Sequence, residues 1–116
     1  VVDDEQPIRD ITKMSLEKYD YKVITAKDGI DAVALYAQHR QEISLVVTNI
    51  FMPEMDGLTT IRTLQKMNPN VKIVGVSGLA SNSQVASDAG SSVKAFLVKP
   101  FTAKELLKTL DGVLSN

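Results

Sequence analysis

Four groups of polar residues in this chain could together handle a divalent cation and a phosphoryl group. Asp3 and Asp4 follow an apolar Val-Val pair, Ser77 follows Ile-Val-Gly-Val, and Lys99 follows Ala-Phe-Leu-Val. Asn49 follows Leu-Val-Val-Thr, at a place where another acid would be expected. Mg²⁺ prefers one or two carboxylates with water and phosphate oxygens, and a hydroxyl or an ammonium can contact a phosphoryl group. The amide at Asn49 therefore decides whether phosphoryl chemistry can occur.

The adjacent acids Asp3 and Asp4 can be explained in two ways. One acid before a helix complements the helix dipole, which contributes about 0.3–1 kcal/mol. Two carboxylates about 4 Å apart repel by roughly 4 kcal/mol at an effective dielectric of 20, and Glu5 adds a third charge. A hard cation would offset this repulsion, so the sequence favours a Mg²⁺ site at Asp3 and Asp4.

Lys99 and Ser77 could be ordinary surface and turn residues, but each directly follows a predicted buried strand. That position points the Lys99 side chain to the strand ends, where it could pair with Asp4 or contact a phosphoryl oxygen. Pro100 restricts Lys99 to an extended backbone and makes a cis bond possible. With Gly78 beside it, the Ser77 hydroxyl is expected to be accessible.

The elements that must position these residues alternate between two hydrophobic patterns. Apolar runs predict strands at residues 21–26, 44–48, 71–77 and 93–98, and three of them are nearly continuous, as in parallel strands buried on both faces. Apolar residues at helical spacing are Ile8, Ile11 and Leu16; Ile30, Val33, Ala34 and Ala37; Leu58, Ile61 and Leu64; and Leu106, Leu107, Leu110, Val113 and Leu114. Pro7 suits the first turn of the first helix.

Capping signals agree with these helices. Asp56 is a candidate N-cap, Thr102 with Glu105 forms a capping box, and Gly90 would end a short helix near residues 85–89. The alternation predicts an α/β sandwich with a mostly parallel sheet and right-handed crossovers. In such sheets the binding crevice lies beyond the carboxyl ends of the strands, where all the polar residues above would meet.

The composition limits the classes of function. The chain of 116 residues is 44% hydrophobic and 23% charged, which fits one soluble domain. Its net charge of −1 gives no electrostatic footprint for nucleic acid or an anionic membrane, and it has neither cysteine nor an apolar run long enough for a membrane span. We expect a cytoplasmic location. The opening Val1-Val2 is typical of the end of a strand, and we expect residues 1–116 to be a single domain excised from a larger polypeptide.

Taken together, these residues resemble the receiver domain of two-component response regulators over essentially the whole chain. The shared motifs are Val-Val-Asp-Asp-Glu at 1–5, Ala-Lys-Asp-Gly at 26–29, Met-Pro-x-Met-Asp-Gly at 52–57, Val-Ser-Gly at 76–78, Ala-Gly at 89–90 and Lys-Pro-Phe at 99–101. The stretches at 76–82 and 94–97 resemble receivers at the C-terminus of hybrid sensor histidine kinases.

The resemblance implies a doubly wound, flavodoxin-like (βα)5 sandwich of three layers, with parallel strand order 2-1-3-4-5. It implies a histidine kinase or histidine phosphotransfer domain as partner, with an output domain possible in the same polypeptide. It also implies roles for individual residues. The implied Mg²⁺ ligands are Asp3, Asp4, Asn49 and the backbone carbonyl of Phe51; the phosphoryl contacts are Ser77 and Lys99; and the switch residues are Ser77 and Phe96. By periodicity alone, Phe96 is a core residue.

Asn49 departs from the family at the aspartate that accepts a phosphoryl group from phosphohistidine. An amide oxygen is a poor nucleophile, and the amide lacks the negative charge that strengthens metal binding. We therefore do not expect Asn49 to be phosphorylated, and we expect weakened Mg²⁺ binding. Asn49 could be native, giving a pseudo-receiver that acts by binding partners; it could be an engineered block; or a neighbouring acid could accept the phosphoryl group instead.

Two other classes of function fit less well. A metal-dependent phosphohydrolase with Asp3 or Asp4 as nucleophile would need a further acid at the third or fourth strand end, where Asn49 and Ser77 stand. A flavin carrier of the same topology would offer Ser, Thr and Gly to the cofactor phosphate, whereas the acids at 3–5 would repel it. The sequence favours a signalling domain that is not an enzyme.

Overall fold

Strands and helices alternate along the chain, as the hydrophobic pattern predicts. The computed structural model describes residues 1–50, 57–77 and 93–115. In chain order the elements are α1 (Gln6–Glu17), α2 (Gly29–His39), β1 (Val46–Asn49), α3 (Gly57–Met67), β2 (Ile73–Ser77), β3 (Val93–Val98) and α5 (Ala103–Leu114). The predicted helix at 85–89, Gly90 and the candidate cap Asp56 lie outside the described residues.

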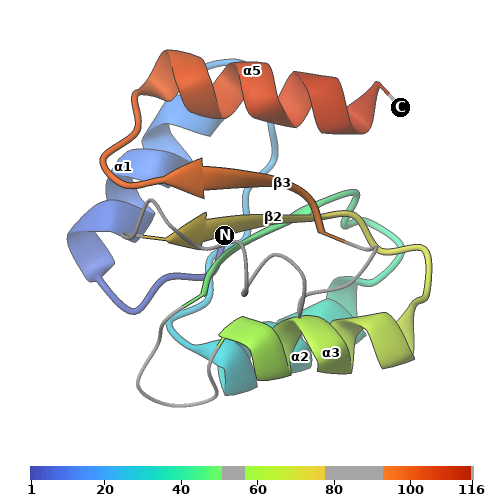
Figure 1. Ribbon diagram of the computed structural model, residues 1–116. Coiled ribbons are helices and arrows are strands. Elements are labelled where there is room, and N and C mark those ends of the chain that lie inside the picture. The colour runs from blue at the N-terminus through green and yellow to red at the C-terminus, as the bar shows by residue number, and fades with distance from the viewer. Residues whose placement is uncertain (51–56, 78–92, 116) are drawn as a thin grey trace.

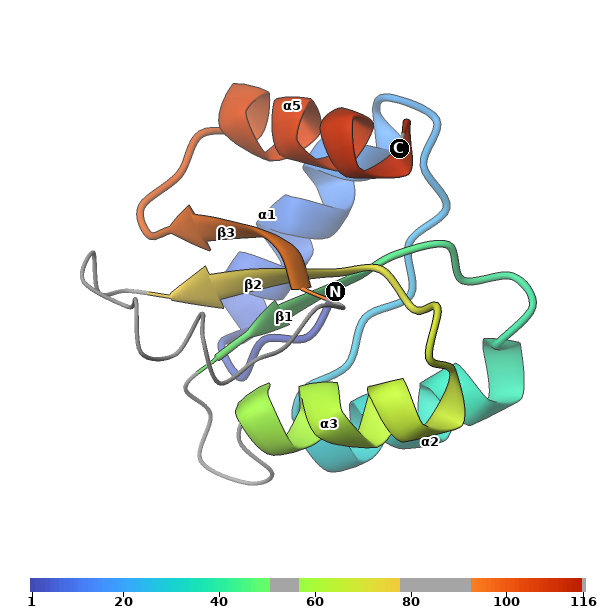
Figure 2. The same cartoon turned by 45° about the vertical axis from the view of Figure 1, so that its right-hand side comes forward.

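The sheet is parallel and has the predicted order. β1 pairs with β2 and β2 with β3, while Val2 forms isolated parallel bridges to Ala26 on one side and to Thr48 of β1 on the other. Counted along the chain, the extended segments are residues 1–2, the segment that ends at Ala26, β1, β2 and β3. Their order across the sheet is therefore 2-1-3-4-5. Helices α1 and α5 cover one face and α2 and α3 the other, so the molecule has three layers (Figures 1 and 2). This confirms the flavodoxin-like α/β fold.

The strand predicted at residues 21–26 is wrong as a continuous element. Within it, Ala26 alone forms a bridge, to Val2, and the other residues have no strand assignment. The backbone hydrogen bonds between this segment and residues 1–3 involve Ile24 and Ala26, at its carboxyl end. A β-strand without a long partner gains too few backbone hydrogen bonds to become regular.

The core consists of two apolar clusters, one on each face of the sheet. Tyr36, Leu64 and Ile73 belong to the cluster beside α2 and α3. Leu110 and Val74 belong to the cluster beside α1 and α5. Successive residues of β2 thus enter opposite clusters, which explains why the run is apolar throughout rather than alternating.

The apolar stripes predicted for the helices are confirmed for α3 and α5 and partly wrong for α1 and α2. In α2 the buried residues are Gly29, Ala32 and Tyr36, whereas Ile30 is 58% exposed. The Tyr36 hydroxyl accepts a hydrogen bond of 3.0 Å from Asn68, which lets this aromatic ring take the core position that the smaller residues were expected to fill.

Helix ends are fixed by side-chain caps. The Thr102 hydroxyl accepts from the N–H of Glu105 at 3.1 Å, which confirms the predicted capping box at α5. Asp28 accepts from the N–H of Asp31 at 2.8 Å and caps α2, a cap the sequence analysis did not single out. In α1, Leu16 is buried as the pattern predicts, but Ile11 is 63% exposed and Thr12 is buried in addition.

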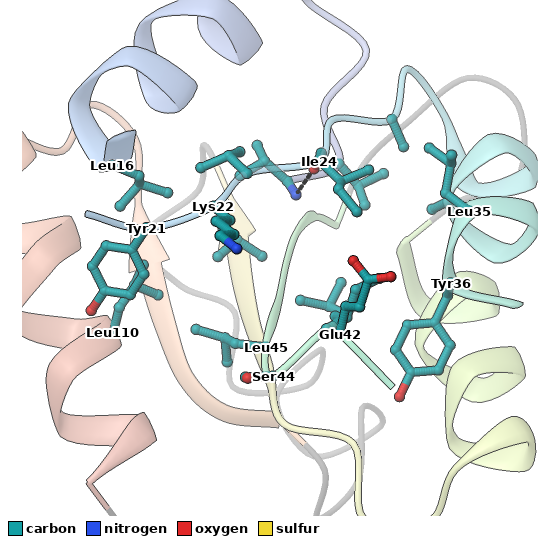
Figure 3. Close-up of a pocket in the computed structure, with 18 of the residues that line it drawn as sticks. Leu16, Tyr21, Lys22, Ile24, Leu35, Tyr36, Glu42, Ser44, Leu45 and Leu110 are labelled. Atoms are coloured by element: carbon teal, nitrogen blue, oxygen red, sulfur yellow. Dashed lines mark hydrogen bonds between the residues drawn. The ribbon is translucent and has the colours of Figure 1, made fainter. Parts of the chain in front are cut away.

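A cavity of about 430 Å³ lies at the amino end of the sheet, the end opposite the polar residues that follow the strands. Figure 3 shows Leu16, Tyr21 and Leu110 along one side of it and Leu35 and Tyr36 along the other. The amino group of Val1 borders the cavity and donates a 2.9 Å hydrogen bond to the carbonyl of Ile24. Burial lowers the pKa of this amino group from 8.0 to about 6.

The lowered pKa of Val1 predicts that the 116-residue chain becomes more stable as the pH rises from 6 to 8. In this window the unfolded chain binds a proton that the folded chain does not, so the free energy of unfolding rises with pH, by roughly 2 kcal/mol between pH 6 and 8. Urea unfolding of a His39→Gln variant, which removes the single histidine, measures this slope. Acetylation of Val1 should abolish it; an equal slope after acetylation would contradict the assignment.

Candidate functional site

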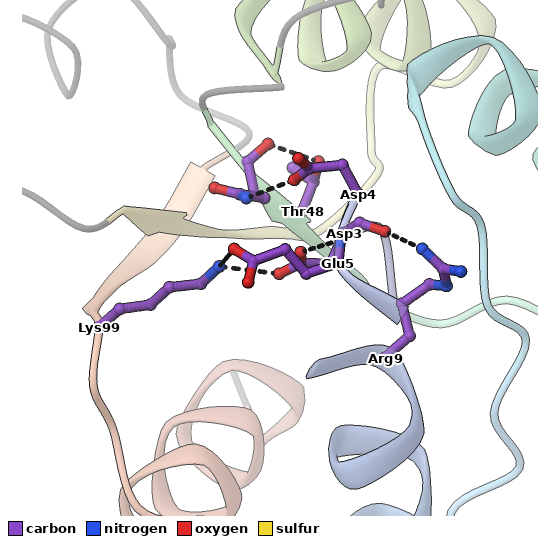
Figure 4. A network of polar contacts seen from close by, with 7 residues as sticks. Asp3, Asp4, Glu5, Arg9, Thr48 and Lys99 are labelled. Carbon is purple, nitrogen blue, oxygen red and sulfur yellow. Dashed lines mark hydrogen bonds and ion pairs between the residues drawn. The ribbon is translucent and has the colours of Figure 1, made fainter. Parts of the chain in front are cut away.

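The polar residues singled out in the sequence gather at the carboxyl end of the sheet. Asp3 follows the bridge residue Val2, Asn49 ends β1, Ser77 ends β2 and Lys99 follows β3. The parallel topology brings these strand ends to one edge, although up to 96 residues separate them in the chain. Figure 4 shows the polar network that results.

Asp3 is the centre of this network. Its carboxylate is buried, with 4% of the residue exposed, and accepts hydrogen bonds from the Glu5 N–H at 2.9 Å and from the Lys99 Nζ at 3.0 Å. The Asp3 carbonyl accepts from Arg9 Nη1 at 2.7 Å. Lys99 also lies 3.9 Å from the Glu5 carboxylate. Lys99 thus pairs with Asp3, not with Asp4 as the sequence suggested.

Asn49 makes a different contact with the second acid. Its side chain is buried, with 7% of the residue exposed, and Nδ2 donates to Asp4 Oδ1 at 3.2 Å. A carboxylate at position 49 would replace this hydrogen bond by a contact between two negative charges. The backbone of Asn49 is fixed as well, because its N–H donates to Val2 at 2.9 Å and its carbonyl accepts from the Thr48 hydroxyl at 3.2 Å.

The donor atoms fit a hard divalent cation. Carboxylate oxygens of Asp3, Asp4 and Glu5 lie within 4.8 Å of one another, and the Asn49 amide oxygen belongs to the same edge. Oxygen donors of this kind are those that Mg²⁺ prefers. Phe51, whose carbonyl was the remaining predicted ligand, lies outside the described residues.

Glu5 and Arg9 belong to the network although the sequence analysis gave them no role in the site. Glu5 was noted as a third charge and directly follows the acid pair, so proximity was the available signal. Arg9 lies six residues after Asp3 on α1 and reaches the Asp3 carbonyl over the first helical turn. No pattern of residue types predicts a contact of this kind, between a side chain and a backbone oxygen.

Ser77 ends β2 and Phe96 lies in the neighbouring strand β3, and the two residues differ in burial. Ser77 is buried, with 2% of the residue exposed, whereas the neighbouring glycine had suggested an exposed hydroxyl. Phe96 is half-buried and pairs in register with Gly75 of β2. A Cβ on Gly75 would lie 2.8 Å from the Phe96 ring and 3.1 Å from Ile50, the residue after Asn49. The bare backbone of Gly75 therefore makes room for the ring.

The comparisons with known proteins agree with this fold. Residues 1–111 match the family model of the response regulator receiver domain. The chain therefore belongs to the receiver-domain family of two-component signalling. Receiver domains are signalling modules rather than enzymes, and they interact with histidine kinases or phosphotransfer proteins. The family typically binds Mg²⁺ at an acidic pocket, and the acids at 3–5 form such a cluster here.

Individual relatives differ in how much of them the chain covers. It is 32% identical to the chemotaxis protein CheY of Bacillus subtilis over 99% of this chain and 95% of that protein. It is 33% identical to the sensor kinase CckA of Brucella abortus over 100% of this chain but only 12% of that protein. A crystal structure of a receiver domain protein from Clostridium thermocellum superposes with a TM-score of 0.88, at 25% identity, covering 98% of this chain and 90% of that one.

Membrane insertion through a helix finds no support in the part of the chain that the structure describes. None of the helices there has both the length and the apolar character that crossing a bilayer requires.

The Lys99–Asp3 pair predicts a large loss of stability when the cation is removed. Lys99→Met leaves the Asp3 carboxylate, whose side chain is 5% exposed, without its charged partner. We expect unfolding by urea at pH 7 to show a loss of about 2–3 kcal/mol. Lys104→Met, on the exposed side of α5, is the matched control and should change stability by less than about 0.5 kcal/mol. Equal stabilities of the two variants would show that the pair contributes nothing.

Proposed function

We propose that this chain is a receiver domain in which Asn49 abolishes phosphoryl acceptance from phosphohistidine. The observation that carries the proposal is the 3.2 Å hydrogen bond from the Asn49 amide to Asp4, at the strand end where the family has its acceptor. A carboxylate oxygen can attack phosphorus and form an acyl phosphate, whereas an amide oxygen is a poor nucleophile. Asn49 keeps the shape of the pocket and loses the reaction.

The remaining residues keep the roles implied by the family. Asp3 and Asp4, with the Asn49 amide oxygen and the Phe51 carbonyl, would hold Mg²⁺, which when bound would neutralise charge on phosphoryl oxygens. Lys99 and Ser77 would contact the phosphoryl group, and Ser77 with Phe96 would form the switch. The contact of Lys99 with Asp3 supports this set, because it holds the ammonium at the carboxyl end of the sheet.

A phosphorylation-independent pseudo-receiver is the second candidate. It is favoured by the hydrogen bonds inside the site: Lys99 contacts Asp3 and Asn49 contacts Asp4, so each acid has an internal donor without a cation. In this case the domain acts by binding partner proteins in one fixed arrangement. Replacing Asn49 by aspartate would place a further negative charge beside Asp4 and make the pocket depend on Mg²⁺.

The wider context is proposed from the relatives. The match to part of a sensor kinase supports a receiver attached to, or working with, a histidine kinase. The match to about half of a response regulator, MprA from Mycobacterium, supports an output region in the same polypeptide as the other arrangement. The cytoplasmic location expected from the sequence stays a prediction.

The proposal predicts that the chain does not gain a phosphoryl group, whereas Asn49→Asp does. Both proteins are incubated with acetyl phosphate and Mg²⁺, and their intact masses are measured. Asn70→Asp, an exposed amide-to-acid change in the turn after α3, is the matched control and should stay unmodified. Labelling of the unchanged chain would overturn the proposal, because another residue would then be the acceptor. No labelling of Asn49→Asp would favour the pseudo-receiver.

The acid pocket also predicts how Asn49→Asp responds to metal. Without a cation, the new carboxylate faces Asp4 at hydrogen-bond distance, so we expect a melting temperature about 5 °C lower in the presence of a chelator. Millimolar Mg²⁺ should restore most of this difference while raising the melting temperature of the unchanged chain less. Scanning calorimetry measures both, with Asn70→Asp as the control for added charge. Parallel responses to Mg²⁺ in all three proteins would contradict a specific effect of position 49.

A further inference from the structure

Arg9 lies near the start of α1, where the helix alone does not favour a positive charge. It is the fourth residue of the helix, and a cation this close to the N-terminus opposes the helix dipole. The arginine is half-buried, and its Nη1 donates to the Asp3 carbonyl at 2.7 Å. Contact with the strand end, rather than helix formation, therefore accounts for an arginine at this position.

The acceptor of this hydrogen bond is the peptide group that joins the two adjacent acids. The Asp3 carbonyl and the Asp4 N–H belong to one planar peptide unit, so a partner on the carbonyl fixes the orientation of the whole unit. On the other side of the residue, the Asp3 N–H donates to the Ala26 carbonyl at 3.2 Å. Both backbone groups of Asp3 are thus held by residues from other segments of the chain.

The two acids are held to different degrees. The Asp3 carboxylate is buried and accepts from both Lys99 and the Glu5 N–H. Asp4 is exposed, and its carboxylate accepts from the Asn49 amide at 3.2 Å, the long end of the usual range for such a bond. The direction of the Asp4 side chain therefore depends strongly on the peptide unit that Arg9 contacts.

Charge alone would give Arg9 the opposite effect on a bound cation. Figure 4 shows Arg9 and Lys99 reaching Asp3 from opposite sides. A guanidinium near the acids lowers the attraction of the pocket for Mg²⁺. A fixed peptide unit raises the affinity, because carboxylates that already point to one place need little further ordering when the ion binds. The two effects differ in sign, so a measurement can separate them.

We propose that Arg9 is a positioning residue of the acid pocket. By holding the peptide unit between Asp3 and Asp4, it directs the Asp4 carboxylate to the place where a divalent cation would bind. The proposal rests on the metal role proposed above for these two acids. It gives α1 a part in the site that the strand ends alone do not supply, since the long arginine side chain reaches back over the first turn of the helix.

The first test needs no metal, because the Asp4 N–H reports directly on the peptide unit concerned. Backbone ¹⁵N relaxation in the presence of a chelator gives its order parameter. We expect a value of about 0.85 in the unchanged chain and about 0.6 in Arg9→Met, with most of the loss restored in Arg9→Lys, which keeps a donor. Arg40→Met, at the exposed C-cap of α2, removes the same charge and should leave Asp4 unchanged.

The second test titrates the same four proteins with Mg²⁺ in a calorimeter, below the melting temperature of each. We expect Arg9→Met to bind Mg²⁺ about tenfold more weakly, although the variant has lost a positive charge near the acids. Arg9→Lys should recover part of this loss, and Arg40→Met should show none. A loss confined to position 9 and reduced by lysine is what a positioning role requires.

Three outcomes would overturn the role of Arg9. An unchanged order parameter at Asp4 in Arg9→Met would mean that the arginine does not hold the peptide unit. Tighter Mg²⁺ binding by Arg9→Met would mean that the guanidinium acts through its charge. Equal weakening by Arg9→Met and Arg40→Met would remove any special effect of position 9. Absence of Mg²⁺ binding to the unchanged chain would instead contradict the metal role of the acids, and the order parameter of Asp4 would then decide the role of Arg9 by itself.

Discussion

The contact between Lys99 and Asp3 is the interaction on which the carboxyl edge of the sheet depends. It joins the segment before α1 to the segment after β3, and these segments lie at opposite ends of the chain. Asp3 is buried, so its charge must be matched inside the protein. Lys99, the N–H of Glu5 and the guanidinium of Arg9 together surround this residue, and each comes from a different position along the chain. The edge is therefore organised before any ligand binds.

The side chain at position 49 sets the charge balance of this edge. In a pocket with three acids, an amide donates where a carboxylate would repel, and Asp4 receives a neutral partner. The Lys99 ammonium then donates to Asp3, and the Asn49 amide donates to Asp4. A cation that enters such a site must compete with both donors. Phosphoryl acceptance and metal binding therefore both depend on the residue at position 49.

The fold and the members of the site could largely be predicted from the sequence, because both depend on strand order and strand ends. Continuous apolar runs identified β1, β2 and β3, and the polar residue after each run identified the edge. The pairing within the edge could not be predicted, since Asp3 and Asp4 are adjacent in the sequence and either carboxylate could be the partner of Lys99. The buried face of α2 was mispredicted because the hydroxyl of Tyr36 finds Asn68, a partner that periodicity does not reveal. Residues 21–26 do not form a continuous strand, because a regular strand requires backbone hydrogen bonds to a partner strand, and residue composition does not show these.

Gly75 and Phe96 show how one side chain can occupy the volume of two positions. They face each other across β2 and β3, and the ring fills the space in which a Cβ on Gly75 would stand. Residue size at the two positions is consequently anticorrelated: any side chain gained at 75 must be matched by volume lost at 96, or the ring must turn outward. A change of residue size at Gly75, inside β2, would in this way affect the aromatic position through shape alone, without altering any charge.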